Sequence, residues 1–259
     1  MSCRFPCRRV AAFLATAVLS LSGTALPAVA GAHAAAGAPV QAAPAGACAD
    51  MSGFDLTRLL PPPPREGSPT EAMELRELLA IQAHRTPEES RRARADSKIS
   101  IFRFADALGD PAAFTPARLP ITTAFFRKFR SDESGVLGSA KRYYARRRPF
   151  VVDSRLHPVD PEPPSASYPS GHSTWATAAG LVLADMVPER RGQILARARA
   201  YAHNRVVGGV HFPSDVQAGE LAGTAIDALL FACPRFEQAE AAAKVELRTA
   251  LGLPPSPAH

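Results

Sequence analysis

Three short segments of the chain combine cationic, imidazole and carboxylate side chains in patterns that a packed helix does not need. In the first segment, Lys141 and Arg148 are seven residues apart. On a helix this spacing places both cations on one face, where a lysine charge and an arginine fork could bind an oxyanion. By itself such a run is more often a solvated basic face or a non-specific anion patch. We expect the other arginines of the run to form that solvated face: Arg142, Arg146 and Arg147.

The second segment, Pro169-Ser170-Gly171-His172, precedes an apolar stretch that is typical of a buried helix. The free amides and the partial positive charge at a helix N-terminus bind anions. Gly171 would let the backbone approach a ligand, and Ser170 could cap the helix or donate its hydroxyl to an oxyanion. His172 would then lie beside the bound anion. A Ser-capped helix with an incidental histidine explains this segment equally well when it is taken alone.

The third segment contains Arg205, the pair Gly208-Gly209, and Asp215 four residues after His211. A carboxylate one helical turn away can fix the tautomer of His211 and leave its other ring nitrogen free to attack. This histidine and aspartate could instead be half of a metal site. However, no further ligands at the usual spacing accompany them, whereas three cations do. The pattern therefore favours an anionic substrate, with neither a metal ion nor a cofactor.

Hydrophobic periodicity indicates which elements must position these segments. Apolar residues recur mostly at three- and four-residue spacing, and the alternation typical of strands is nearly absent. The predicted helices cover residues 70–84, 87–108, 122–130, 138–148, 173–187, 188–205, 214–233 and 236–251. The sequence therefore predicts an all-α, single-domain helical bundle with its catalytic domain over residues 61–253.

The first 30 residues are typical of a secretory signal peptide. Three arginines precede an uncharged apolar stretch, and Ala28-Val29-Ala30 has the pattern of a cleavage site. An uncleaved membrane anchor is the alternative. Residues 31–60 are expected to form an Ala/Gly/Pro-rich linker and N-terminal segment. Elsewhere no run is long enough to cross a bilayer, so we expect a periplasmic or secreted protein without stable membrane insertion.

Charge and cysteine content agree with export. Removing Arg4, Arg8 and Arg9 lowers the formal net charge from +6 to +3, so the basicity does not indicate a nucleic-acid partner. Cys48 and Cys233 remain after cleavage. In an oxidising compartment they are expected to form one disulfide, with two free buried thiols as the alternative.

The order of the three segments is that of a known signature. Lys-x6-Arg-Pro, then Pro-Ser-Gly-His, then Arg-x5-His-x3-Asp resembles the type 2 phosphatidic acid phosphatase superfamily. That superfamily includes bacterial class A non-specific acid phosphatases, glucose-6-phosphatase-like enzymes and vanadium haloperoxidases. The three segments look most like the class A acid phosphatases, over about residues 61–251. Asn204 stands where that family usually has serine. This difference puts the fine tuning of the site in doubt but not the mechanism.

The resemblance implies a role for each residue. His211 would attack the substrate and form a phosphohistidine, and Asp215 would orient it. His172 would protonate the leaving alkoxide and later act as the base for water. The implied phosphate cradle consists of Lys141, Arg148, Ser170, the Gly171 amide and Arg205. The implied activity is metal-independent hydrolysis of small-molecule phosphate monoesters, with phosphate transfer to alcohols as an extension.

Other functions on the same fold stay open. A vanadium haloperoxidase uses the same pocket around vanadate, but such chains are usually longer. A lipid phosphate phosphatase would usually carry several membrane spans. A non-catalytic phosphate-binding protein would not need His172, His211 and Asp215 together. Whether the chain forms a homo-oligomer also stays open.

Overall fold

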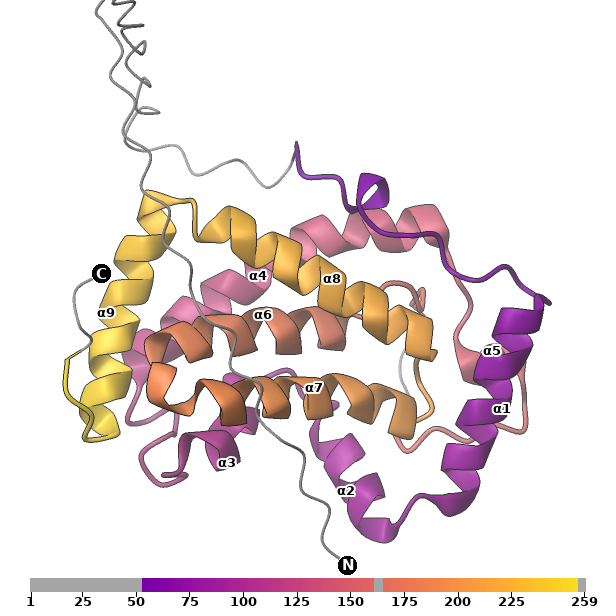
Figure 1. The fold of residues 1–259 in the computed structure, drawn as a ribbon, viewed down its shortest axis with the longest axis horizontal. Coiled ribbons are helices and arrows are strands. Elements are labelled where there is room, and N and C mark those ends of the chain that lie inside the picture. Colours follow the sequence, from indigo (N-terminus) through magenta and orange to yellow (C-terminus); the bar gives the residue numbers. More distant parts are fainter. Residues whose placement is uncertain (1–52, 161–164, 256–259) are drawn as a thin grey trace, which may run out of the picture. The chain divides into compact units, whose positions relative to one another are not determined.

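The computed structural model describes residues 53–160 and 165–255. The predicted signal peptide and Cys48 lie outside these residues. In the described part of the chain all the regular elements are helical, which confirms the all-α prediction (Figure 1). The α-helices are α1 (Pro69–His84), α2 (Pro87–Ala95), α3 (Ala105–Leu108), α4 (Pro120–Tyr144), α5 (Pro149–Val152), α6 (Gly171–Met186), α7 (Arg191–Val207), α8 (Pro213–Leu230) and α9 (Pro234–Ala250). The short 3-10 turns are η2 (Leu56–Arg58), η3 (Ile101–Phe104) and η4 (Pro188–Arg190).

Helix α6 forms the centre of the bundle. It packs against α4, α7 and α8 (Figure 1). Most of the residues of α6 are small or apolar and buried. The approach of α8 is close, because a Cβ atom on Gly219 would lie 2.5 Å from the carbonyl oxygen of Ser170. A glycine is therefore required where α8 crosses the N-terminus of α6. This crossing brings the second and third sequence motifs together.

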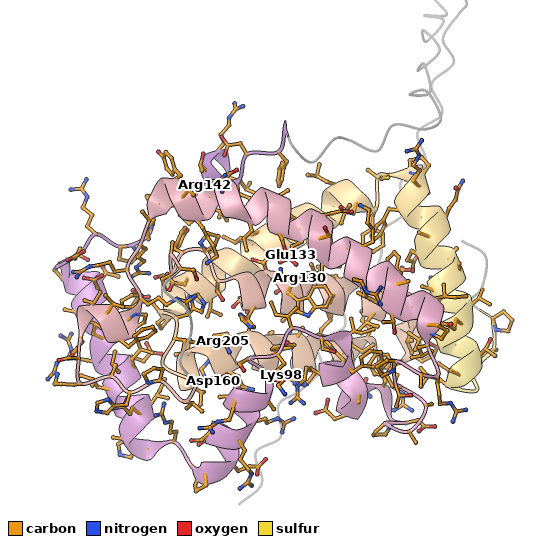
Figure 2. The ribbon with its side chains drawn as sticks, turned by 180° about the vertical axis from the view of Figure 1, so that it is seen from behind. Lys98, Arg130, Glu133, Arg142, Asp160 and Arg205 are labelled. Carbon is orange, nitrogen blue, oxygen red and sulfur yellow. The ribbon has the colours of Figure 1, made fainter. Side chains whose placement is uncertain are left out.

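The predicted helices at 122–130 and 138–148 are one continuous helix, α4 (Figure 2). Its glycines at 135 and 138 do not break it, because one face packs aromatic and aliphatic side chains into the core. The helix ends at Tyr144, since Ala145 has a left-handed backbone with φ 46°. Arg148 is extended and caps α5. The prediction that Lys141 and Arg148 share one helix face is therefore wrong.

The predicted helix at 87–108 is also interrupted. Helix α2 ends at Ala95, and a 3-10 turn and the short α3 follow it. Asp96, directly after α2, is fully buried and accepts hydrogen bonds from Arg103, Arg197 and Asn204. A buried carboxylate needs such donors, and satisfying it ties the end of α2 to α7.

The two ends of the described chain pack onto the same bundle. Leu56 and Leu60, from the predicted N-terminal segment, are buried in the core. Cys233 is buried at the start of α9, where its sulfur accepts from the Phe236 amide at 3.4 Å. In the described part of the chain, no single helix has the length and apolar character of a membrane span, although the bent pair α8 and α9 meets these criteria jointly.

Candidate active site

A cavity of about 250 Å³ collects residues from all three motifs. Five of the predicted site residues line it: Lys141, Arg148, Gly171, His172 and His211. The other three are buried, with exposed fractions of 1% or less: Ser170, Arg205 and Asp215. The fold therefore places the predicted residues in and around one small cavity.

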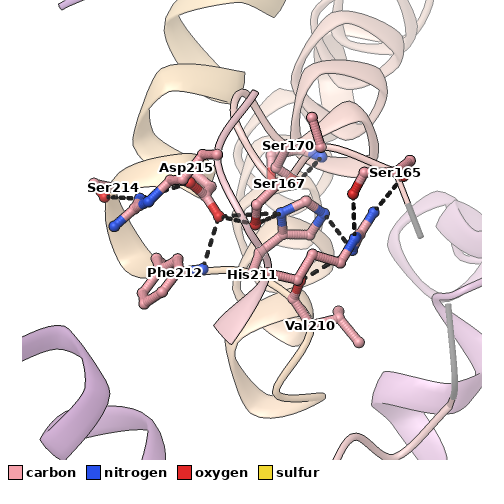
Figure 3. Close-up of polar contacts among 12 residues, drawn as sticks. Ser165, Ser167, Ser170, Val210, His211, Phe212, Ser214 and Asp215 are labelled. Atoms are coloured by element: carbon pink, nitrogen blue, oxygen red, sulfur yellow. Dashed lines mark hydrogen bonds and ion pairs between the residues drawn. The ribbon is translucent and has the colours of Figure 1, made fainter. Parts of the chain in front are cut away.

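His211 and Asp215 lie at the start of α8. His211 directly precedes Phe212, the residue that caps the helix, and Asp215 lies in the first turn. Nδ1 of His211 is 3.3 Å from Oδ2 of Asp215 (Figure 3). The same oxygen accepts the Phe212 amide at 2.9 Å and the hydroxyl of Ser167. The carboxylate is thus fixed, and Nε2 of His211 is the ring nitrogen left for the cavity.

Arg146 is buried and binds Asp215 on the side away from His211. The prediction that Arg146 lies on a solvated face is therefore wrong. Its Nη1 donates to Oδ1 of Asp215 at 2.7 Å and to the Ser214 hydroxyl at 2.8 Å. Its Nη2 donates to Glu74 at 2.9 Å, and its guanidinium lies 3.8 Å from the centre of the Phe212 ring. The run lies outside the helix, and Arg146 and Arg148 are buried while Arg147 is exposed. A helical interpretation of the run does not predict this burial of Arg146.

The cations of the first motif are held by the loop that precedes α6. Arg148 donates from Nε to the carbonyl of Ser165 at 3.0 Å and from Nη2 to its hydroxyl at 2.9 Å. Its Nη1 lies 3.3 Å from Nε2 of His211. Lys141 donates to the carbonyl of Ala166 at 2.7 Å. Sequence reasoning missed Ser165 and Ser167, whose one signal is their place among small residues just before the second motif.

The N-terminus of α6 completes the lining. The Ser170 hydroxyl accepts the Ser173 amide at 3.3 Å, so this serine caps the helix. Gly171 is the first helical residue and lines the cavity. A Cβ atom there would lie 3.0 Å from Leu137. The position therefore keeps the helix N-terminus, with its partial positive charge, open to an anion.

Asn204 and Arg205 occupy the last turn of α7. Asn204 donates to Oδ2 of Asp96 at 2.7 Å, so this residue, where the family usually has serine, anchors α7 to the end of α2. Burial, with a further contribution from the nearby charge of Arg148, lowers the pKa of Arg205 to about 10. The two arginines therefore lie within electrostatic reach of each other.

Burial of so many cations shapes the electrostatics of the cavity. Burial lowers the pKa of Lys141 to about 8, with a further contribution from Arg148. Charges crowded in a poorly hydrated site repel each other, and an anion relieves that repulsion. Among the described residues, no group of three or more His, Cys, Asp or Glu side chains is placed to hold a metal ion. The electrostatics thus favour an anionic ligand.

Burial disfavours the protonated form of both histidines. Burial lowers the pKa of His172 to about 4, and Nε2 of its ring lies 2.8 Å from the carbonyl of Ser97. Burial, followed by the charges of Arg148 and Lys141, holds the pKa of His211 well below its usual value. Burial raises the pKa of Asp215, and the ion pair with Arg146 opposes that rise. The protonated form of His211 is thus disfavoured, and the unprotonated ring is the form that can act as a nucleophile.

Comparisons with known proteins agree with this geometry. The sequence profile of the PAP2 superfamily matches residues 131–239. A non-specific acid phosphatase of Salmonella typhi is 31% identical over 197 residues, which cover 73% of this chain and 78% of that protein. An acid phosphatase of Zymomonas mobilis subsp. mobilis is 30% identical over 202 residues, covering 74% and 75% of the two chains.

Among solved structures, a bacterial vanadium-dependent iodoperoxidase shares the fold. Its TM-score is 0.50 at 20% sequence identity, covering 66% of this chain and 51% of that chain. Identity at this level supports the architecture alone. The sequence matches extend over all three motifs and most of the catalytic region. The chain therefore belongs to the PAP2 superfamily, together with the bacterial non-specific acid phosphatases.

Proposed function

We propose that the chain is an exported, metal-independent acid phosphatase that hydrolyses a broad range of phosphate monoesters through a phosphohistidine. One observation carries the proposal: the pair of His211 and Asp215, 3.3 Å apart, opens on a cavity that Lys141 and Arg148 also line. Relatives that are 30–31% identical are named acid phosphatases, which supports the same activity here.

In the first step, Nε2 of His211 attacks phosphorus while the bond from phosphorus to the leaving oxygen breaks. Asp215 at Nδ1 stabilises the positive charge that the ring gains. His172, which also lines the cavity, gives a proton to the departing oxygen. The products are an alcohol and a phosphorylated His211.

In the second step, the neutral His172 takes a proton from water, and the water oxygen attacks phosphorus. The bond between phosphorus and His211 breaks, and inorganic phosphate leaves. An alcohol in the place of water would receive the phosphoryl group instead, which would give phosphotransferase activity. His172 is therefore an acid in the first step and a base in the second, whereas His211 gains and then loses the phosphoryl group.

The remaining residues hold the transferred group. Phosphoryl transfer depends mainly on positioning and on stabilising charge at the equatorial oxygens. Lys141, Arg148 and the Gly171 amide line the cavity, and Ser170 and Arg205 lie buried beside it. Fixed donors of this kind stabilise a transition state because they need no reorganisation during the reaction.

Export and the disulfide belong to the same proposal. The composition of the chain supports a signal peptide at residues 1–30, a linker and N-terminal segment at 31–60 and a catalytic domain at 61–253. Buried Cys233 at the start of α9 would pair with Cys48, which lies outside the described residues. Mass spectrometry of the secreted, unreduced protein would give the cleavage site and the Cys48–Cys233 peptide.

A substrate panel on the mature protein tests the activity. Nucleotides, sugar phosphates, aryl phosphates and phosphatidic acid are assayed at acidic pH, with and without excess chelator. We expect turnover of several soluble monoesters that chelation does not reduce. Halide oxidation with vanadate and peroxide, in the absence of ester hydrolysis, would instead support a haloperoxidase on this fold. Activity that zinc or magnesium restores after chelation would contradict the metal-free mechanism.

A further inference from the structure

Helix α4 contributes more to the cavity than the lysine of the first motif. Arg130, Ser134 and Gly138 are spaced four residues apart and line the cavity together with Lys141. This spacing keeps them on one face of the helix. Arg130 lies about 16 Å before Lys141 along the helix axis, at 1.5 Å per residue. The cavity thus has a cation that lies outside the three sequence motifs.

Arg130 is anchored at one side and open at the other. Its Nη1 donates to Oε2 of Glu133 at 3.1 Å, and Glu133 is fully buried. The Arg130 side chain is 32% exposed. Both lie in the middle of α4 (Figure 2). A guanidinium has five donors, so one bond to Glu133 positions Arg130 and leaves donors for a ligand.

The position of Arg130 relates it to the leaving group rather than to the nucleophile. Arg148 lies 3.3 Å from Nε2 of His211, on the attacking side. Among the cations near His172, the charge of Arg130 lowers its pKa most, ahead of Arg148 and Lys141. Arg130 and His172 also line the same cavity. Because His172 is the proposed proton donor to the leaving oxygen, Arg130 lies on the side of the cavity that the leaving group would occupy.

We propose that Arg130 binds a second anionic group, a carboxylate or a phosphate, carried by the leaving group of the substrate. This inference rests on the proposed function and specifies its substrate class. Ile99 and Leu137 also line the cavity and offer apolar surface for a carbon skeleton between the two anions. The matching substrates are small phosphorylated acids and bisphosphates, whose second anion pairs with the arginine.

Binding of phosphonates tests the inference without depending on catalysis. Calorimetry gives the Kd of phenylphosphonate, of 4-carboxyphenylphosphonate and of 1,4-phenylenebisphosphonate for the mature enzyme. The matched control is Arg142→Gln, because Arg142 is an exposed arginine of the same helix outside the cavity. We expect the preference for the two ligands with an anionic para group over phenylphosphonate to fall about tenfold in Arg130→Gln and to stay at its wild-type value in Arg142→Gln.

Kinetics with the corresponding phosphate esters provides the second readout. The ratio of kcat/KM for 4-carboxyphenyl phosphate to that for phenyl phosphate should fall about tenfold in Arg130→Gln, mainly through KM. If Arg130 affected only the pKa of His172, the kcat/KM values of both esters would change by the same factor in Arg130→Gln. The unchanged ratio of these values would overturn the inference. An unchanged phosphonate preference would overturn it as well.

Two further measurements distinguish loss of the binding site from misfolding of the variant and from failure of the proposed activity. Arg130→Gln leaves Glu133 buried without its ion pair, so the double variant Arg130→Gln/Glu133→Gln is measured beside it. The double variant should show the same loss of preference. A wild-type enzyme that binds the phosphonates with the expected preference but hydrolyses no ester would contradict the proposed function and support the binding site.

Discussion

Arg146 donates from Nη1 to Oδ1 of Asp215 at 2.7 Å, and both side chains are buried. The other oxygen of that carboxylate faces His211. Arg146 also reaches Glu74, whose second oxygen accepts the Ser214 amide at 2.7 Å. The carboxylate that orients the nucleophile is therefore itself oriented by a buried arginine that connects α1 to the start of α8.

Replacing Arg146 should damage both stability and catalysis. In Arg146→Gln, Asp215 and Glu74 lose their shared buried counter-charge. Breaking a buried ion pair by removing one partner costs about 3–5 kcal/mol of unfolding free energy. A loosened His211 should lower kcat by on the order of 100-fold in the protein that remains folded. Urea unfolding and steady-state kinetics at low urea measure the two effects.

The adjacent arginine supplies the control. Arg147 is half exposed and pairs with exposed Glu66. Arg147→Gln should change the unfolding free energy by less than about 1 kcal/mol and leave kcat unchanged. If Arg146→Gln lost stability but kept the wild-type kcat, Arg146 would be a structural residue only, and its role in positioning Asp215 would be wrong.

His172 as the proton donor predicts a dependence on the leaving group. An alkoxide is a poor leaving group and needs a proton, whereas 4-nitrophenolate leaves with little help. His172→Gln should therefore reduce kcat/KM for an alkyl phosphate by about 100-fold or more, and far less for 4-nitrophenyl phosphate. The exposed His203 is the control, and His203→Gln should change neither.

The pH profile checks the same assignment. Because burial lowers the pKa of His172 to about 4 in the free enzyme, its acid form becomes more populated as pH falls toward that value. The kcat/KM for alkyl phosphates should therefore rise toward acidic pH in the wild type and lose this rise in His172→Gln. Equal losses for alkyl and nitrophenyl esters, at every pH, would show that His172 binds substrate without transferring a proton.

The buried carboxylate Glu133 predicts how stability changes with pH. Burial raises its pKa from 4.5 to about 7, against the opposing charge of Arg130. The folded state then holds the proton more tightly than the unfolded state. The contribution of Glu133 to the unfolding free energy is therefore fully present below about pH 4.5, and it is lost as pH rises to about 7. The unfolding free energy should fall over this range by on the order of 3 kcal/mol from this group.

Urea denaturation at pH 4.5 and pH 7 measures this loss. The unfolding free energy of Glu133→Gln should fall less between these two pH values than that of the wild type, because the glutamine side chain has no proton to release. Asp227 keeps part of the slope, since burial and then the nearby Glu133 also raise its pKa. The exposed Glu237→Gln should keep the full wild-type slope. The same slope in Glu133→Gln and the wild type would rule out Glu133 as its source.

Much of the candidate site could be predicted because it lies at helix ends. Ser170 and Gly171 mark the start of α6, and Asp215 lies one turn after His211 at the start of α8. Cap residues and short local spacings are visible in a sequence. The resemblance to a known family then joined segments that are far apart along the chain, which local spacing alone does not do.

The rest depended on tertiary packing. The sequence pattern predicts two helices, 122–130 and 138–148, but burial of one face of α4 keeps the helix continuous through the glycines at 135 and 138. The backbone leaves the helix at Ala145, so Arg146 and Arg148 point inward and Arg147 outward. A three-arginine run shows no such alternation in residue type. The contacts of Ser167 are equally invisible, because its partners are distant in the sequence. Arg130 and Glu133 are only three residues apart, but their spacing does not show that Arg130 lines the cavity.

The central claim is that His211 becomes phosphorylated during turnover. The direct measurement is a rapid acid-free quench of the enzyme with 32P-labelled phenyl phosphate, followed by peptide mapping of the base-stable, acid-labile label. We predict a label on His211 in the wild type and in His203→Ala. We predict no label and no turnover in folded His211→Ala. Turnover in His211→Ala, or a label on another residue, would contradict the account.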